Sequence, residues 1–146
     1  MSLQSNPSNS VTNIPPQRPW PSRLFVETTT RCNLHCRMCV KETWDRSAME
    51  GDMADETFAA LEEAFPHLEA IVLNGVGEPL LDSRLERFIR RSKELMPPGS
   101  WVGFQSNGML LDEKRAVSLL NAGLDRICIS ADALNPETFR EIRRGG

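Results

Sequence analysis

The chain has 146 residues, of which 40% are hydrophobic and 25% charged, and its formal net charge is -3. These proportions are typical of one ordinary soluble domain with enough apolar residues for a core. The acidic balance and the lack of a lysine or arginine run argue against nucleic-acid and membrane-surface binding. No stretch approaches the roughly 18 consecutive apolar residues of a membrane span, and the amino terminus has no secretory pattern. We therefore expect small or neutral partners and a cytoplasmic location.

Residues 1–22 are rich in Ser, Asn and Pro and show no apolar period. Such a composition is typical of a flexible leader. The sequence therefore predicts a flexible N-terminal segment over 1–22 and a folded domain over 23–146.

Short apolar runs alternate with helix-period segments through the rest of the chain. Strands are predicted over 24–29, 70–75, 101–106 and 126–130, because short runs of apolar and β-branched residues are typical of buried strands. Apolar residues at spacings of three and four predict helices over about 58–68 and 81–95. A third helix is expected near 112–122, with Asp112 as N-cap and Gly123 at its end, and a fourth from Pro136, capped by Asn135.

Four β/α units in series predict an α/β fold with a parallel sheet, either open and doubly wound or part of a barrel. In both architectures catalytic and ligand-binding residues lie on the loops that follow the carboxyl ends of the strands. Four unusual loops follow the four predicted strands: "RCNLHCRMC" (31–39), "NGVGEP" (74–79), "QSNG" (105–108) and "SAD" (130–132). We expect a functional site at this edge of the sheet.

Three of the four cysteines lie in the first of these loops, at Cys32, Cys36 and Cys39. Clustered thiolates prefer iron–sulfur clusters or zinc, and three ligands leave one coordination position for a substrate or cofactor. His35 is the alternative fourth ligand, which would make a closed zinc site. The remaining cysteine, Cys128, is expected to be a small buried hydrophobe within the fourth strand.

The pattern Cys32-x-x-x-Cys36-x-x-Cys39 after a first strand resembles the signature of the radical S-adenosylmethionine (radical SAM) superfamily. "ETTTRCNLHCRMC" is similar to the branch that contains molybdenum-cofactor biosynthesis enzymes and peptide-modifying maturases. The resemblance spans about 23–146 and implies part of a partial TIM-type (β/α)6 barrel, with four β/α units present and the core incomplete at its C-terminus. It also implies a [4Fe-4S] cluster on the three cysteines, whose fourth iron is chelated by S-adenosyl-L-methionine (SAM).

Gly75-Val76-Gly77-Glu78 resembles a longer variant of the family's glycine–glycine–glutamate motif. Glycines let the backbone approach a ligand closely, and a carboxylate accepts from an ammonium group, although a plain turn after a strand has the same composition. Many members have an aromatic residue where this chain has Met38, a position that packs near the adenine. The resemblance further implies contacts to the methionine carboxylate or the ribose from Ser106, Asn107, Ser130 and Asp132. Arginines near the end of the last helix are expected to be solvated rather than to bind a carboxylate: Arg140, Arg143 and Arg144.

The resemblance implies a radical SAM enzyme in which a reduced cluster cleaves SAM to a 5'-deoxyadenosyl radical that abstracts hydrogen from a substrate. The implied partners are SAM, an unknown peptide or small-molecule substrate, and an electron donor such as flavodoxin or ferredoxin. A non-catalytic zinc-binding module is the alternative; an electron carrier is disfavoured because carriers close every cluster position with protein ligands. The fourth strand is predicted to be an exposed edge, open to pairing with a second copy of the chain in a dimer.

Overall fold

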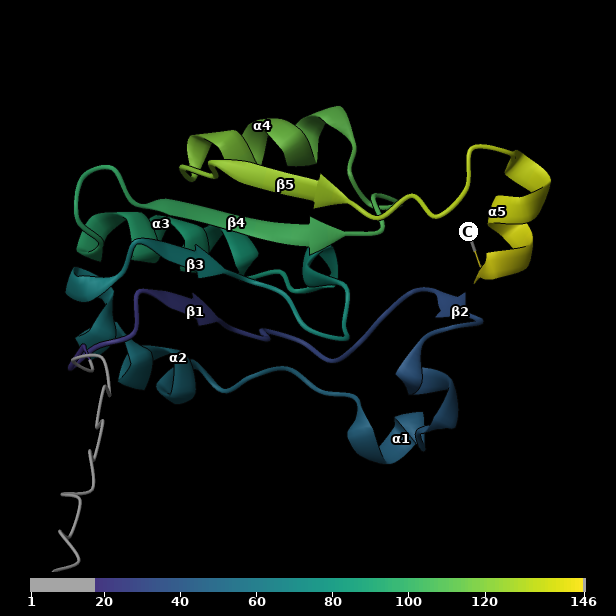
Figure 1. Ribbon diagram of the computed structural model, residues 1–146, viewed down its shortest axis with the longest axis horizontal. Helices are drawn as coiled ribbons and strands as arrows, with labels where there is room; N and C mark the ends of the chain where they lie inside the picture. The colour runs from purple at the N-terminus through teal and green to yellow at the C-terminus, as the bar shows by residue number, and fades with distance from the viewer. Residues whose placement is uncertain (1–17, 146) are drawn as a thin grey trace, which may run out of the picture.

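The computed structural model describes residues 18–145, and a parallel sheet lies at its centre (Figure 1). The strands are β1 (Arg23–Phe25), β3 (Ala70–Val72), β4 (Trp101–Ser106) and β5 (Arg126–Ile129). They lie in the order β1-β3-β4-β5, and every neighbouring pair is parallel. The predicted α/β fold with a four-stranded parallel sheet is therefore confirmed. β1 and β3 each end before the corresponding predicted segment does.

Helices lie along one face of this sheet in Figure 1: α2 (Asp55–Leu61), α3 (Leu85–Leu95) and α4 (Glu113–Asn121). The core forms between this face and the helices. It contains Ile71 of β3, Leu73 just after β3 and Phe104 of β4, and helix residues such as Phe88 and Ile89. Burial of each such side chain contributes about 1.5–3 kcal/mol.

The opposite face of the sheet carries no helix in this view, and Phe25 is 71% exposed. Phe25, Trp101, Gln105 and Cys128 line an open groove on the sheet. Cys128 is exposed, so the prediction of a buried small hydrophobe was wrong. The reason is that β5 is an edge strand whose Cys128 pairs in register with Gln105, on the face away from the helices.

The helix-end signals in the sequence are confirmed. Asp112 accepts a hydrogen bond from the backbone of Arg115, and Gly123 follows α4 with a φ of +95°. Asn135 caps α5 (Pro136–Ile142) by accepting from two backbone N–H groups of its first turn. The first two predicted helices are shorter than expected. α2 passes into a 3-10 helix, η2 (Glu62–His67), which contains Pro66, and the short η3 (Pro79–Leu81) precedes α3.

The predicted N-terminal leader is described only from residue 18 onward; residues 1–17 lie outside the described part of the chain. The carbonyl of Ser22 accepts from the backbone of Glu69 at 2.8 Å. Trp20 stacks on His67, with ring centroids 4.9 Å apart. The last residues of this segment therefore contact the folded domain. No helix over 18–145 is both long and apolar enough to cross a membrane.

A second, two-stranded pairing joins distant parts of the chain. β2 (His35–Cys36) pairs antiparallel with β6 (Arg143–Arg144), so that Cys36 lies opposite Arg143. The cysteine loop continues into η1 (Val40–Thr43) and α1 (Arg46–Met49). Figure 1 shows α5 and β2 near one another, beyond the carboxyl ends of the main strands. The end of the described chain is thereby fixed against the cysteine loop.

Candidate cofactor site

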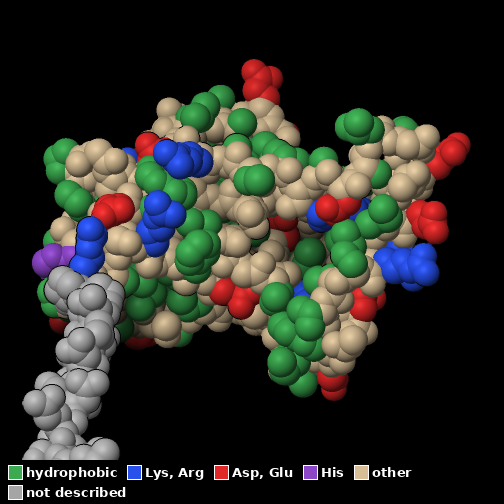
Figure 2. Space-filling view, in the orientation of Figure 1, with side chains coloured by type: hydrophobic (Ala, Val, Ile, Leu, Met, Phe, Trp, Pro, Cys, Tyr) green, Lys and Arg blue, Asp and Glu red, His purple; other side chains and the backbone are tan. Residues whose placement is uncertain are grey.

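The four loops at the carboxyl ends of the strands meet around one pocket of about 210 Å³. In Figure 2 it opens as a hollow between the larger body, which carries the sheet, and the smaller part formed by α1 and α5. Every predicted site residue except Asp132 lines it: Cys32, Cys36, Met38, Cys39, Gly75, Gly77, Glu78, Ser106, Asn107 and Ser130. The lining also includes Val76, Gln105 and Arg143. Val76 and Gln105 were missed as individual residues, although both lie within the loops singled out in the sequence.

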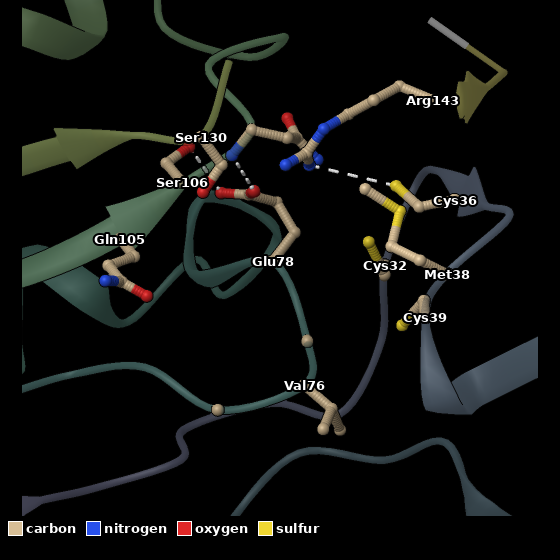
Figure 3. A pocket seen from close by; sticks show the side chains of 13 residues that line it. Cys32, Cys36, Met38, Cys39, Val76, Glu78, Gln105, Ser106, Ser130 and Arg143 are labelled. Atoms are coloured by element: carbon tan, nitrogen blue, oxygen red, sulfur yellow. Dashed lines mark hydrogen bonds between the residues drawn. The ribbon is translucent and has the colours of Figure 1, made fainter. Parts of the chain in front are cut away.

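The three cysteines of the loop are free thiols on one side of this pocket (Figure 3). Cys36 is buried, and Cys32 and Cys39 are half-buried. Burial raises the pKa of the Cys36 thiol, the neighbouring cysteines raise it further, and the charge of Arg143 acts in the opposite direction. Within residues 18–145, no three His, Cys, Asp or Glu side chains converge on a position for a single metal ion.

His35, the alternative zinc ligand, lies apart from the three thiols. Its side chain is 56% exposed, and its Nδ1 lies 3.5 Å from a carboxylate oxygen of Glu42. It does not line the pocket. The residues that face the pocket therefore supply thiol sulfur but no imidazole.

A buried lysine closes the cysteine loop at its base. Lys41 is 1% exposed, and its ammonium group donates to the carbonyl of Thr30 and to the Glu50 carboxylate, the latter at 2.7 Å. Donation from Lys41 lowers the pKa of Glu50. Because Thr30 precedes the loop and Lys41 follows it, this contact holds the two ends together. A lone lysine gives no sign of this role in a sequence.

The glycines of the second loop pack closely against the segment that follows β1. A Cβ on Gly77 would overlap the Thr29 carbonyl and lie 2.9 Å from that of Arg31, and a Cβ on Gly75 would overlap the Glu27 carboxylate. One oxygen of Glu27 accepts from Val76 N at 2.5 Å and from Gly77 N at 3.2 Å. The close approach expected for a ligand is thus also made by the segment that follows β1.

Glu78 joins the second loop to the third. Glu78 is 2% exposed, and its carboxylate accepts from Ser106 Oγ at 2.8 Å and Asn107 N at 2.7 Å (Figure 3). It also accepts from Leu80 N at 3.1 Å. Donors of the protein therefore already engage both oxygens. The carboxylate holds Ser106 and Asn107 at the pocket wall, a role that the sequence did not predict.

Arg143 of β6 lies beside the sulfurs and is bound by the fourth loop. Ser130 lines the pocket, but Asp132 does not; it binds Arg143 instead, with 2.5 Å between carboxylate and guanidinium. Arg143 is 12% exposed, and its Nη1 lies 3.8 Å from Cys36 Sγ. The prediction that this arginine is solvated was wrong, because β6 carries it inward, whereas Arg140 and Arg144 are exposed.

Residues 26–146 match the family model of the radical SAM superfamily. The chain belongs to the radical SAM superfamily. It is 36% identical over 114 residues to the tungsten-containing aldehyde ferredoxin oxidoreductase cofactor-modifying protein of Pyrococcus furiosus, covering 76% of this chain and 31% of that one. It is 35% identical over 130 residues to the GTP 3',8-cyclase of Pelotomaculum thermopropionicum, covering 84% of this chain and 38% of that one.

Among solved structures, the chain is similar to BtrN in complex with AdoMet and 2-DOIA. The TM-score is 0.68 at 27% identity, over 83% of this chain and 50% of that one. This radical SAM chain spans less than half the length of the two curated relatives named above. The resemblance inferred from the cysteine motif is confirmed.

Proposed function

We propose that the chain is the cluster- and SAM-binding part of a radical SAM enzyme. Cys32, Cys36 and Cys39 would hold a [4Fe-4S] cluster, and SAM would complete the iron that lacks a protein ligand. The supporting observation is that all three thiols line one pocket, together with residues of the other three strand-end loops. The donor set fits the group, because thiolates are the protein ligands of iron–sulfur clusters.

When bound, the cluster supplies one electron that cleaves SAM to a 5'-deoxyadenosyl radical, which abstracts hydrogen from the substrate. The chain itself would bind and orient the cluster and SAM, and would exclude water from them. Glu78 fixes the backbone N–H of Asn107 and the hydroxyl of Ser106 at the wall. Met38 offers an apolar surface for an adenine, and Ser130 a polar edge for the carboxylate or ribose of SAM.

We also propose that the chain forms part of a partial (β/α)6 barrel. A partial (β/α)6 barrel accounts for a sheet with helices along one face, an open groove on the other and β5 at an edge. Further β/α units next to β5 would cover that groove and complete a pocket for a peptide or small-molecule substrate. An electron donor such as flavodoxin or ferredoxin would supply the electron. The alternative to further β/α units is a dimer, in which a second copy of the chain pairs with the β5 edge.

The zinc module remains the alternative to be tested, and metal analysis separates it from the proposal. The chain is reconstituted anaerobically with iron and sulfide, and its metal content and colour are compared with those of Cys36→Ser and Cys128→Ser. We expect a brown iron–sulfur protein for the wild type and Cys128→Ser, and loss of the intact cluster in Cys36→Ser. A colourless wild type that binds about one zinc ion, as a structural site does, would contradict the proposal.

A further inference from the structure

Arg143 is the one positively charged side chain in the lining of the cysteine pocket, among the described residues. Its Nη1 lies 3.8 Å from Cys36 Sγ, within range of a hydrogen bond to sulfur, as the dashed line in Figure 3 shows. An arginine stays protonated in proteins, so this contact places a full positive charge beside one of the three sulfurs.

Two independent contacts hold this guanidinium in place. The backbone of Arg143 lies opposite Cys36 in the β2–β6 register, and Arg37 N donates to Ile142 O at 2.9 Å. Nε and Nη2 of Arg143 both lie 2.5 Å from Asp132 Oδ2, which leaves Nη1 directed at the sulfur. Asp132 is therefore a positioning residue for Arg143, rather than part of the pocket wall.

The electrostatic effect on a group bound at Cys36 has a definite sign. A cluster gains one negative charge on reduction, and a nearby cation stabilises the more negative state. Hydrogen bonds to the sulfurs and net charge are among the factors that set cluster potentials. Because the Arg143 side chain is only 12% exposed, solvent and salt screen this interaction weakly. The Asp132 carboxylate is 36% exposed, so water reduces its opposing charge more strongly.

We propose that Arg143, braced by Asp132, raises the midpoint potential of the cluster through a charged hydrogen bond to the Cys36 sulfur. The inference rests on the proposed function, since it requires a cluster on Cys36. It assigns to Asp132 and Arg143 a role in electron acceptance that is separate from the binding of SAM.

The test is an anaerobic redox titration of the reconstituted chain, with the reduced cluster followed by electron paramagnetic resonance in the absence of SAM. Wild type, Arg143→Met and Arg143→Gln are compared with Arg140→Met, which removes the same charge from an exposed position of α5. We expect Arg143→Met to lower the reduced-to-oxidised ratio at a fixed potential at least tenfold, a shift of about 59 mV for one electron. Arg143→Gln should shift less, because its amide still donates, and Arg140→Met should match the wild type.

Each outcome separates this inference from the proposed function. A wild type that takes up no cluster overturns the proposed function, and this inference with it. A loaded Arg143→Met with the wild-type potential overturns this inference alone. If Arg143→Met takes up no cluster, the potential of Arg143→Gln decides, and an unchanged value overturns the inference. Loss of the cluster from both variants, with Arg140→Met loaded, would show a purely structural role for Arg143 and would also overturn it.

Discussion

Replacement of Glu78 by Gln tests whether this carboxylate links two loops of the pocket. The side chain is 2% exposed and accepts three hydrogen bonds, from Ser106 Oγ, Asn107 N and Leu80 N. A glutamine keeps one oxygen and turns the other into a donor, so at least one buried N–H loses its acceptor. A hydrogen bond to a charged group contributes about 1.5–3 kcal/mol, and we expect the free energy of unfolding to fall by that amount. For a domain of this size the melting temperature should fall by about 5–10 °C.

The assay is urea or thermal unfolding of the apo chain, followed by circular dichroism. Glu63→Gln is the matched control, because Glu63 is an exposed glutamate in η2. The control should stay within about 0.5 kcal/mol of the wild type, as most surface substitutions do. If Glu78→Gln were as stable as the control, the three hydrogen bonds would not hold the loops, and a direct role toward a ligand would be the better account of Glu78.

Three further predictions concern the loops that form the pocket. Gly77→Ala should destabilise the chain by at least about 2 kcal/mol in urea unfolding, because its Cβ overlaps the Thr29 carbonyl. Gly51→Ala, where nothing lies within 4 Å of the added Cβ, should leave stability nearly unchanged, and an equal loss in both variants would refute the steric reason. Lys41→Met should lower the free energy of unfolding by about 2–3 kcal/mol. This is below the range for a fully buried ion pair, because Glu50 is partly exposed. A loss under about 0.5 kcal/mol would contradict this prediction. The lowered pKa of Glu50 contributes stability that is present above the usual glutamate pKa and lost as pH falls through the lowered value. The acid side of a stability–pH curve should therefore flatten in Lys41→Met, whereas an unchanged curve would show that the pair contributes nothing.

The fold could be predicted from the sequence where a periodic signal was long or a cap was strong. β4 occupies the predicted 101–106, and the caps Asp112 and Asn135 lie where the sequence places them. These features depend on local interactions, which a single sequence carries. The exposure of Cys128 could not be predicted, because it depends on whether a neighbouring element covers that face of β5, and this is a tertiary property.

In the candidate site, too, some features could be predicted from the sequence, and those that depend on tertiary contacts could not. In a parallel sheet the loops at the carboxyl ends of the strands lie at one edge. This rule was enough to predict that the cysteines lie near Glu78 and Ser130. What the sequence did not show are the contacts across the pocket. The inward turn of Arg143 follows from β6, a strand of two residues, which is too short to carry a periodic signal. The buried ion pair of Lys41 joins residues nine positions apart around a turn, with no pattern to distinguish it from a solvated pair.

The proposed function requires that the three cysteines hold a cluster with one iron open to SAM. The most direct measurement is electron paramagnetic resonance of the anaerobically reconstituted, dithionite-reduced chain, recorded with and without SAM. We predict a reduced [4Fe-4S] signal that changes when SAM is added, because SAM then becomes a ligand of the open iron. A signal that is identical with and without SAM, or a chain that takes up zinc and no cluster, would contradict the claim.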